Sequence, residues 1–255
     1  MKLIDTHCHL DFPELSVDID AVLERAHKAG VAKFVVPGVS ADNWDAVLNL
    51  CSEHAGFYPA LGLHPCFLKG EHAADIALLA SKLKGNNQIV AVGEIGLDLF
   101  IPDANLQQQM AVLIPQLTLA KEYQKPVLLH VRKAHDPLLK QLRQLKLERA
   151  GLVHAFSGSE QQAREYLKLG FKLGIGGSVT YERATKLRRL VAELPLESFV
   201  LETDSPDMPL QGYQGQVNYP ERIAEVAAAV AKIRQQPLAE VIEVTSVQSS
   251  KFLGL

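Results

Sequence analysis

Two histidines separated by one residue follow a short apolar run near the start of the chain, in the segment Leu3–His9. On a β-strand, residues i and i+2 point to the same side, so we expect the imidazoles of His7 and His9 to project together. Asp5 shares their parity and is expected one layer deeper, where its carboxylate can hold an imidazole in the tautomer that metal binding needs. The segment predicts half of a metal site, which further ligands must complete.

Four later apolar runs each lead into a residue that can bind a metal. These are Glu94 after residues 88–92, His130 ending 126–130, His154 ending 151–154 and Asp204 after 198–202. With His7 and His9 they form a set of four imidazoles and two carboxylates, which suits Zn or Mn, or Mg where waters complete the shell. Six ligands exceed what one tetrahedral ion takes, and a carboxylate can bridge two ions about 3.5–4 Å apart. We therefore predict two divalent ions per subunit, with Glu94 as the bridge.

The elements that must position these residues alternate regularly along the chain. Short apolar runs typical of strands occur at the first segment and at residues 33–36, 57–61, 88–92, 126–130, 151–154, 171–175 and 198–202. Between them lie stretches with helical apolar spacing, at residues 19–26, 44–51, 75–83, about 105–123 and about 136–147, after Ser159, after Thr180, and in a last pair beginning near Pro220 and Pro237. Ser159 and Thr180 are expected to cap their helices.

Eight strands alternating with helices indicate an α/β fold of the (β/α)8 TIM-barrel type. A doubly wound sheet is disfavoured because no G-x-G-x-x-G turn follows the first strand. No repeat or linker suggests a second domain, so residues 1–255 are expected to form one barrel of the metal-dependent hydrolase type. In such barrels the carboxyl ends of the strands meet at one rim, which would bring all six candidate ligands together.

Composition narrows the classes of function. The chain has 255 residues, 47% of them hydrophobic and 22% charged, with a formal net charge of −3. This balance excludes a broadly basic protein that coats nucleic acid. No apolar run reaches about 18 residues, so no membrane span is expected, and the N-terminus does not resemble a signal peptide. Three cysteines without C-x-x-C spacing favour a reducing compartment, and we expect a cytoplasmic protein.

Together these segments resemble the TatD family of metal-dependent hydrolases, and within it the YjjV-type members. The matching segments are Ile4–Leu10, Gly62–Pro65, Gly93–Asp98, Leu129–His130, His154–Gly158 and Leu201–Pro206. The resemblance implies that one cation is held by His7, His9, Glu94 and Asp204, and the other by Glu94, His130 and His154. It also implies magnesium-dependent DNase activity. Two departures bear on substrate preference: Leu99–Phe100 stands where the family usually has an aromatic pair, and Gln248 where it usually has Asn.

Other residues near the expected rim have more than one interpretation. Arg132 shares the parity of His130 and is expected either to clamp a phosphate or to form a surface ion pair. His64 is expected to donate a proton or bind phosphate, or else to pack in a loop. Residues 174–178 offer backbone N–H groups to a phosphate or, as we prefer, allow close backbone packing. Glu202 is expected to orient a ligand rather than react.

The leading hypothesis is a two-metal phosphodiesterase, a deoxyribonuclease acting on DNA ends, in which Asp204 takes a proton from the attacking water and Glu94 holds both ions. Few phosphate contacts are expected from the composition, which favours strand ends over long duplex. The alternative is an amide, ester or lactone hydrolase acting on a small molecule or aminoacyl ester. A non-enzymatic, metal-dependent binding module is a third reading. DNA or another phosphoester is the expected partner, with no membrane and no obligate protein partner.

Overall fold

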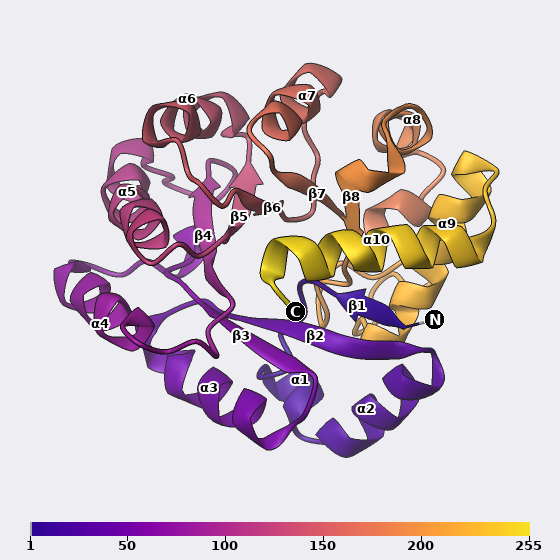
Figure 1. Ribbon diagram of the computed structural model, residues 1–255, viewed down its shortest axis with the longest axis horizontal. Coiled ribbons are helices and arrows are strands. Elements are labelled where there is room, and N and C mark those ends of the chain that lie inside the picture. Colours follow the sequence, from indigo (N-terminus) through magenta and orange to yellow (C-terminus); the bar gives the residue numbers. More distant parts are fainter. Residues whose placement is uncertain (1) are drawn as a thin grey trace.

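Eight parallel strands run through residues 2–255, the part of the chain that the computed structural model describes, and they neighbour one another in sequence order (Figure 1). They are β1 (Leu3–Asp5), β2 (Val31–Gly38), β3 (Phe57–Leu61), β4 (Ala91–Asp98), β5 (Val127–Arg132), β6 (Gly151–Val153), β7 (Lys172–Ile175) and β8 (Phe199–Leu201). Just beyond β1, the Thr6 N–H donates to the carbonyl of Leu201 at 3.1 Å, linking the first strand to the last. The sheet is thus a nearly closed barrel, which confirms the predicted (β/α)8 class.

Helices follow the strands and surround the barrel (Figure 1). The α-helices are α1 (Pro13–Ser16), α2 (Ile19–Lys28), α3 (Trp44–Glu53), α4 (Ala73–Leu83), α5 (Leu106–Glu122), α6 (His135–Leu145), α7 (Glu160–Lys168), α8 (Thr185–Glu193), α9 (Ile223–Arg234) and α10 (Leu238–Leu253). Short 3-10 helices span Ala41–Asn43, Pro65–Phe67, Gly177–Thr180, Leu196–Ser198 and Pro220–Arg222. Among residues 2–255, no helix is both long enough and apolar enough to cross a membrane.

The largest departure from the expected boundaries is in β4, which begins at Ala91 and continues to Asp98 instead of ending at residue 92. Gly93 and Gly96 look like turn signals in the sequence. In the fold they let β4 approach β5 closely, since a Cβ at Gly96 would lie 1.9 Å from the carbonyl oxygen of His130. The strand register also shifts between Val92 and Ile95. Glu94 therefore lies within the strand and not beyond its end.

The two predicted helix caps had different outcomes. Ser159 caps α7, where it forms a capping box with Gln162. The prediction for Thr180 was wrong, because α8 begins five residues later, at Thr185. Thr180 instead ends a 3-10 helix, where its hydroxyl donates to the carbonyl of Gly177 and accepts the N–H of Gln211.

The barrel interior is filled by a layer of small and branched apolar side chains near the amino ends of the strands. The layer consists of Val35, Ala60, Ala91, Leu128, Leu152 and Val200. Leu253, from the end of α10, packs against this layer and is 3% exposed. Figure 1 shows α10 crossing one end of the barrel, with the C-terminus near the barrel axis. With this end covered, the carboxyl ends of the strands are the open end.

Candidate metal centre

Glu94 lies at the centre of a buried cluster of imidazoles at the carboxyl ends of the strands. Its Oε2 is 3.1 Å from Nε2 of His7 and 3.7 Å from Nε2 of His9. Its Oε1 is 3.1 Å from Nδ1 of His130 and 3.2 Å from Nε2 of His64. The two oxygens of one carboxylate thus face two separate pairs of imidazoles, which come from the ends of three strands, β1, β3 and β5.

Asp204 approaches the cluster from the end of β8. Its Oδ1 is 3.6 Å from Nε2 of both His7 and His9, and 3.4 Å from Nε2 of His154. The rings of His7 and His154 stack with their centroids 3.7 Å apart. Asp204 has a φ of +59°, in the left-handed region, and its N–H donates to the carbonyl of His7 at 2.9 Å. All six candidate ligands therefore meet at one end of the barrel.

Asp5 is buried beneath the histidines, as its parity predicts, but its partners differ from those expected. Its carboxylate accepts hydrogen bonds from the N–H and the hydroxyl of Thr203, at 3.0 and 2.6 Å, and from the N–H of His7 at 3.3 Å. Burial raises the pKa of Asp5 to about 7 although these hydrogen bonds lower it. Asp5 thus ties the loop after β1 to the segment after β8 instead of holding an imidazole.

Two carboxylates lie behind the imidazoles of the cluster. Oε1 of Glu202 is 3.1 Å from Nδ1 of His154, in the position expected of an orienting group. Oδ2 of Asp98 is 2.9 Å from Nε2 of His130, a contact for which the sequence analysis had no role. The signal was present, because Asp98 follows Glu94 by four residues and so shares its side of an extended strand. Such carboxylates fix the tautomer and orientation of metal-binding imidazoles.

Comparison with known proteins identifies the family. Residues 4–254 match the family model described as TatD related DNase. The chain belongs to the TatD family. It is 48% identical over 243 residues to the uncharacterized metal-dependent hydrolase YjjV of Escherichia coli K12, covering 95% of this chain and 94% of that protein. It is 35% identical over 264 residues to human deoxyribonuclease TATDN3, covering 98% of this chain and 94% of that protein.

A solved structure supports the same assignment. The crystal structure of YjjV, a TatD homologue from Escherichia coli K12, superimposes with a TM-score of 0.96 at 46% identity, covering 99% of this chain and 98% of that one. The resemblance to the TatD family, and to its YjjV-type members, is therefore confirmed. As a member of this family the chain is a metal-dependent hydrolase.

The donors of this TatD-family site fit divalent cations. Nε2 of His7 and Nε2 of His9 each lie 3.6 Å from Oδ1 of Asp204. Two ligands bound tetrahedrally at about 2.0–2.2 Å to one ion lie about 3.3–3.6 Å apart, so this spacing fits a shared ion. Imidazole nitrogens combined with carboxylate oxygens are the ligands that Zn and Mn accept.

The electrostatics of the site favour ionised carboxylates. Burial raises the pKa of Glu94, but the surrounding imidazoles, led by His64 and His7, lower it to well below its usual range. Burial likewise raises the pKa of Asp204, but the neighbouring His154 lowers it to below its usual range. Burial lowers the pKa of His154, whereas its neighbouring carboxylates raise it well above the ordinary value. Both carboxylates therefore stay charged at neutral pH, which is the state that binds a cation.

His64 is part of the cluster and not of a packed loop. Its Nδ1 accepts the N–H of Cys66 at 3.1 Å. A neutral imidazole that accepts at one nitrogen carries its proton on the other, so Nε2 is the nitrogen that donates to Glu94. The structure thus places a hydrogen-bond donor beside the candidate bridging carboxylate.

Arg132 lies at the mouth of the site with its side chain half exposed. Its guanidinium covers the ring of Phe100 with Cζ 4.3 Å from the ring centroid, and one of its nitrogens lies 4.0 Å from Oδ2 of Asp98. Phe100 occupies one position of the aromatic pair that is usual in the family. Together the ring and the carboxylate hold the guanidinium at the rim of a cavity of about 920 Å³ that also contains the cluster.

The glycines after β7 serve close packing, the interpretation preferred from the sequence. A Cβ at Gly174 would lie 2.3 Å from Oε2 of Glu202. At Gly177 it would lie 2.5 Å from the carbonyl oxygen of Met208. A side chain at Gly174 would displace Glu202, and with it the support of His154, whereas one at Gly177 would displace the backbone at Met208.

Proposed function

We propose that this chain is a phosphodiesterase of the two-metal type, a deoxyribonuclease that acts on DNA ends. The observation that carries the proposal is the position of Glu94, whose two carboxylate oxygens face separate groups of imidazoles. A carboxylate so placed can bridge two cations. The family description, TatD related DNase, and the name of the human relative, a deoxyribonuclease, support a nucleic acid substrate.

We infer that the ligands would divide into two groups that share Glu94. His7, His9, Glu94 and Asp204 would hold one divalent ion, and Glu94, His130 and His154 the other, whether Mg, Mn or Zn. When bound, such ions acidify a water and offset negative charge on a phosphoryl group. The buried, ionised carboxylates and the imidazole nitrogens are the protein's contribution to holding them.

The remaining steps fall to side chains of this chain. Asp204 is ionised at neutral pH and lies beside the cluster, where it takes the proton of the attacking water. Arg132, held by Phe100 and Asp98, offers a two-pronged guanidinium to the nonbridging phosphate oxygens. His64 carries an N–H on the nitrogen that faces the cluster and can donate a hydrogen bond from it to a phosphate oxygen.

Preference for strand ends follows from the charge distribution. The chain has a net charge of −3, which disfavours contacts to many phosphates along a duplex. The site is a cavity of about 920 Å³ and not an extended groove, which suits a strand terminus better than the middle of a helix.

None of the cysteines forms a disulfide within residues 2–255, as befits the reducing cytoplasm that we infer for this protein.

The test is hydrolysis of short single-stranded DNA after chelation, with Mg, Mn or Zn added back. We expect activity to return with metal and to fall by more than about 100-fold in Glu94→Ala, because a shared ligand contributes more than the outer groups whose loss costs about 10–100-fold. Glu148→Ala, at an exposed glutamate, is the matched control and should retain activity.

Two outcomes would move the proposal to the second candidate, a hydrolase of amides, esters or lactones. One is stoichiometric metal binding with turnover of a carbonyl substrate and none of DNA. The other is a kcat/KM for such a carbonyl substrate that stays unchanged in Arg132→Ala, since only a phosphoryl substrate needs that clamp. DNA cleavage that persists in Glu94→Ala would reject the two-metal mechanism itself.

A further inference from the structure

The cavity extends well beyond the candidate metal ligands. Its volume of about 920 Å³ is at the upper end of the range for small-molecule sites, and one phosphodiester group at the cluster fills only part of it. Part of its wall is formed by residues 183–187, which lead into and begin α8 and include none of the candidate metal ligands. This wall is available to a part of the substrate that does not react.

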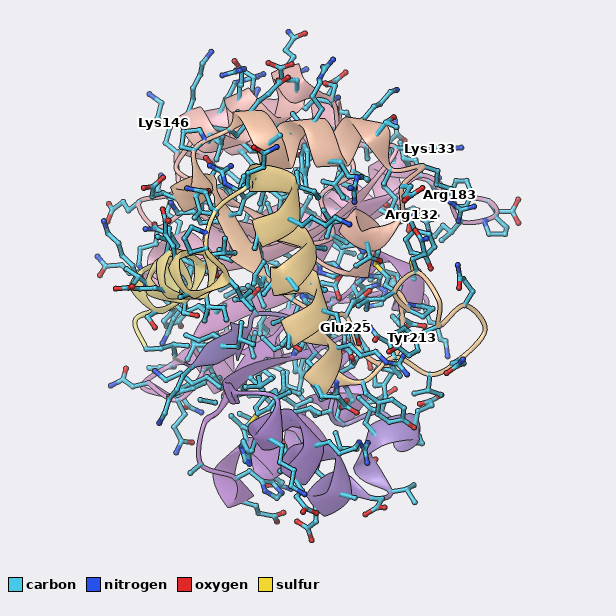
Figure 2. The ribbon with its side chains drawn as sticks, turned by 90° about the vertical axis from the view of Figure 1, so that its right-hand side faces the viewer. Arg132, Lys133, Lys146, Arg183, Tyr213 and Glu225 are labelled. Atoms are coloured by element: carbon cyan, nitrogen blue, oxygen red, sulfur yellow. The ribbon has the colours of Figure 1, made fainter. Side chains whose placement is uncertain are left out.

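The charged side chains on the cavity wall are mostly cationic. Among residues 2–255 and outside the candidate metal ligands, the wall carries Arg132, Arg183 and Lys186 against one carboxylate, Asp207. Figure 2 shows Arg132 and Arg183 on the same side of the molecule, although they come from different elements. In a chain of net charge −3, this concentration of positive charge indicates an anionic ligand.

Arg183 and Lys186 are not engaged in the ion pairs that occupy their neighbour. In the described part of the chain, neither has a carboxylate within 4.0 Å, whereas Arg189 on the same helix lies 3.2 Å from Glu160. Arg183 is nevertheless held in place, because its guanidinium lies 5.1 Å from the ring centroid of Tyr181. An exposed, anchored cation without a carboxylate partner is poised to bind an anion.

The position of these cations disfavours a purely structural role. Lys186 is in the first turn of α8, and that turn has no acidic residue. The helix dipole disfavours cations at a helix start and favours anions there. Lys186 therefore gains nothing from the helix dipole, but it is well placed beside an incoming phosphate.

We propose that Arg183 and Lys186 form a second phosphate subsite, which binds the phosphate next to the one being hydrolysed. This inference rests on the proposed phosphodiesterase function and refines it. The substrate class becomes an oligonucleotide with at least two phosphates. A single-phosphate diester reaches the metal centre but leaves this subsite empty.

The test compares bis(p-nitrophenyl) phosphate, which has one phosphate, with a thymidine trinucleotide, which has two phosphodiesters. In the holoenzyme with Arg183→Ala and Lys186→Ala combined, kcat/KM for the trinucleotide should fall about tenfold, as two charge-assisted contacts are lost. The value for the single-phosphate diester should stay within about twofold. Arg189→Ala is the matched control and should change neither.

Two trinucleotides, each with one linkage replaced by a neutral methylphosphonate, keep a single charged phosphate and so cannot fill both sites. The wild type should cleave each of them about tenfold more slowly than the unmodified trinucleotide, well beyond the twofold effect of losing one cleavable bond. In the double variant the substituted and unmodified trinucleotides should differ by no more than that twofold effect. Wild-type rates on both substituted trinucleotides within twofold of the unmodified one, or an equal loss on both substrate classes in the double variant, would overturn the subsite.

Failure of the proposed function is separable from failure of the subsite. If the metal-loaded wild type hydrolyses neither substrate, the phosphodiesterase proposal fails, and binding of a labelled six-nucleotide single strand is then measured directly. For each phosphate contact that the double variant loses, the slope of log affinity against log salt should become less steep by about 0.7 than in the wild type. An unchanged slope, or no binding by the wild type, rejects the subsite as well.

Discussion

Asp98 orients an imidazole without belonging to the six expected metal ligands. Its Oδ2 lies 2.9 Å from Nε2 of His130, and its Oδ1 accepts the N–H of Phe100 at 2.7 Å. Burial raises the pKa of Asp98, but the hydrogen bonds with His130 and Phe100 lower it to about 2. Asp98 is therefore a carboxylate at any pH at which the enzyme works, and it leaves Nδ1 of His130 as the nitrogen that faces Glu94.

Asp98→Asn should weaken metal binding at the part of the site that contains His130. The amide keeps the size of the side chain but removes the charge that polarises the imidazole, and losing such a partner lowers metal affinity about 10–100-fold. Calorimetric metal titration measures the affinity, and activity should recover at higher metal concentration. Asp103→Asn, at an exposed loop position with positive φ, is the control. Unchanged affinity in Asp98→Asn would mean that His130 is oriented by other contacts.

At the level of single residues, the six candidate ligands could be placed from the sequence because each follows an apolar run. Their types and their positions at or just after the ends of the apolar runs were sufficient, although β4 continues past Glu94. Asp98 and the contact of His64 with Glu94 were not assigned, because both depend on where one side chain points relative to another strand. Strand parity predicts that Asp98 lies on the same side of β4 as Glu94. The glycines of β4 nevertheless made the segment up to Asp98 resemble a turn.

At the level of elements, two buried glutamines on α5 hold the strand ends that carry the site. Gln109 exchanges hydrogen bonds with the backbone of Asp98, accepting its N–H and donating to its carbonyl, both at 2.8 Å. Gln116, two turns later on the same face, accepts the N–H of Leu63 at 2.7 Å. Gln109 thus holds the backbone of Asp98 itself, and Gln116 holds the residue just before His64. Helix α5 therefore positions both Asp98 and His64.

Gln109→Leu should destabilise the fold. The change leaves the N–H and the carbonyl of Asp98 buried without partners, and each unsatisfied group costs about 1–3 kcal/mol. We expect the free energy of unfolding in urea to fall by about 2–4 kcal/mol. Gln107→Leu, at an exposed position two residues earlier on the same helix, should change the free energy of unfolding by less than about 0.5 kcal/mol. A loss of similar size in the control would show that the glutamine contacts are not the cause.

The existence and order of the elements could be predicted because apolar periodicity distinguishes strands from helices. The helix expected at about 105–123 is α5, at Leu106–Glu122. The role of its glutamines could not be predicted, since their partners are backbone groups of a distant strand. The start of α8 was also missed, because Thr180 has the chemistry of a cap but the chain forms a 3-10 helix first.

At the level of the whole molecule, the barrel has one end that stabilises and one that reacts. Leu253 of α10 packs against the apolar layer at the amino ends of the strands, which includes Leu128 and Leu152. On each of these two strands the candidate ligand follows two residues later, at His130 and His154. Alternating strands and helices predict the barrel. They do not predict which helix covers the amino ends of the strands, because that depends on how the last helix folds back.

Leu253→Ala should therefore lower stability without changing metal binding. Truncating a side chain that is 3% exposed leaves a cavity against the interior layer, and such changes cost about 2–5 kcal/mol. Urea unfolding of the metal-free protein measures this loss, and metal titration of the folded protein measures the affinity. Val247→Ala, on the same helix and 55% exposed, should change neither. If the metal affinity of Leu253→Ala fell together with its stability, the packing of the interior layer would affect the positions of the imidazoles. An unchanged affinity would show that the two ends of the barrel are energetically independent.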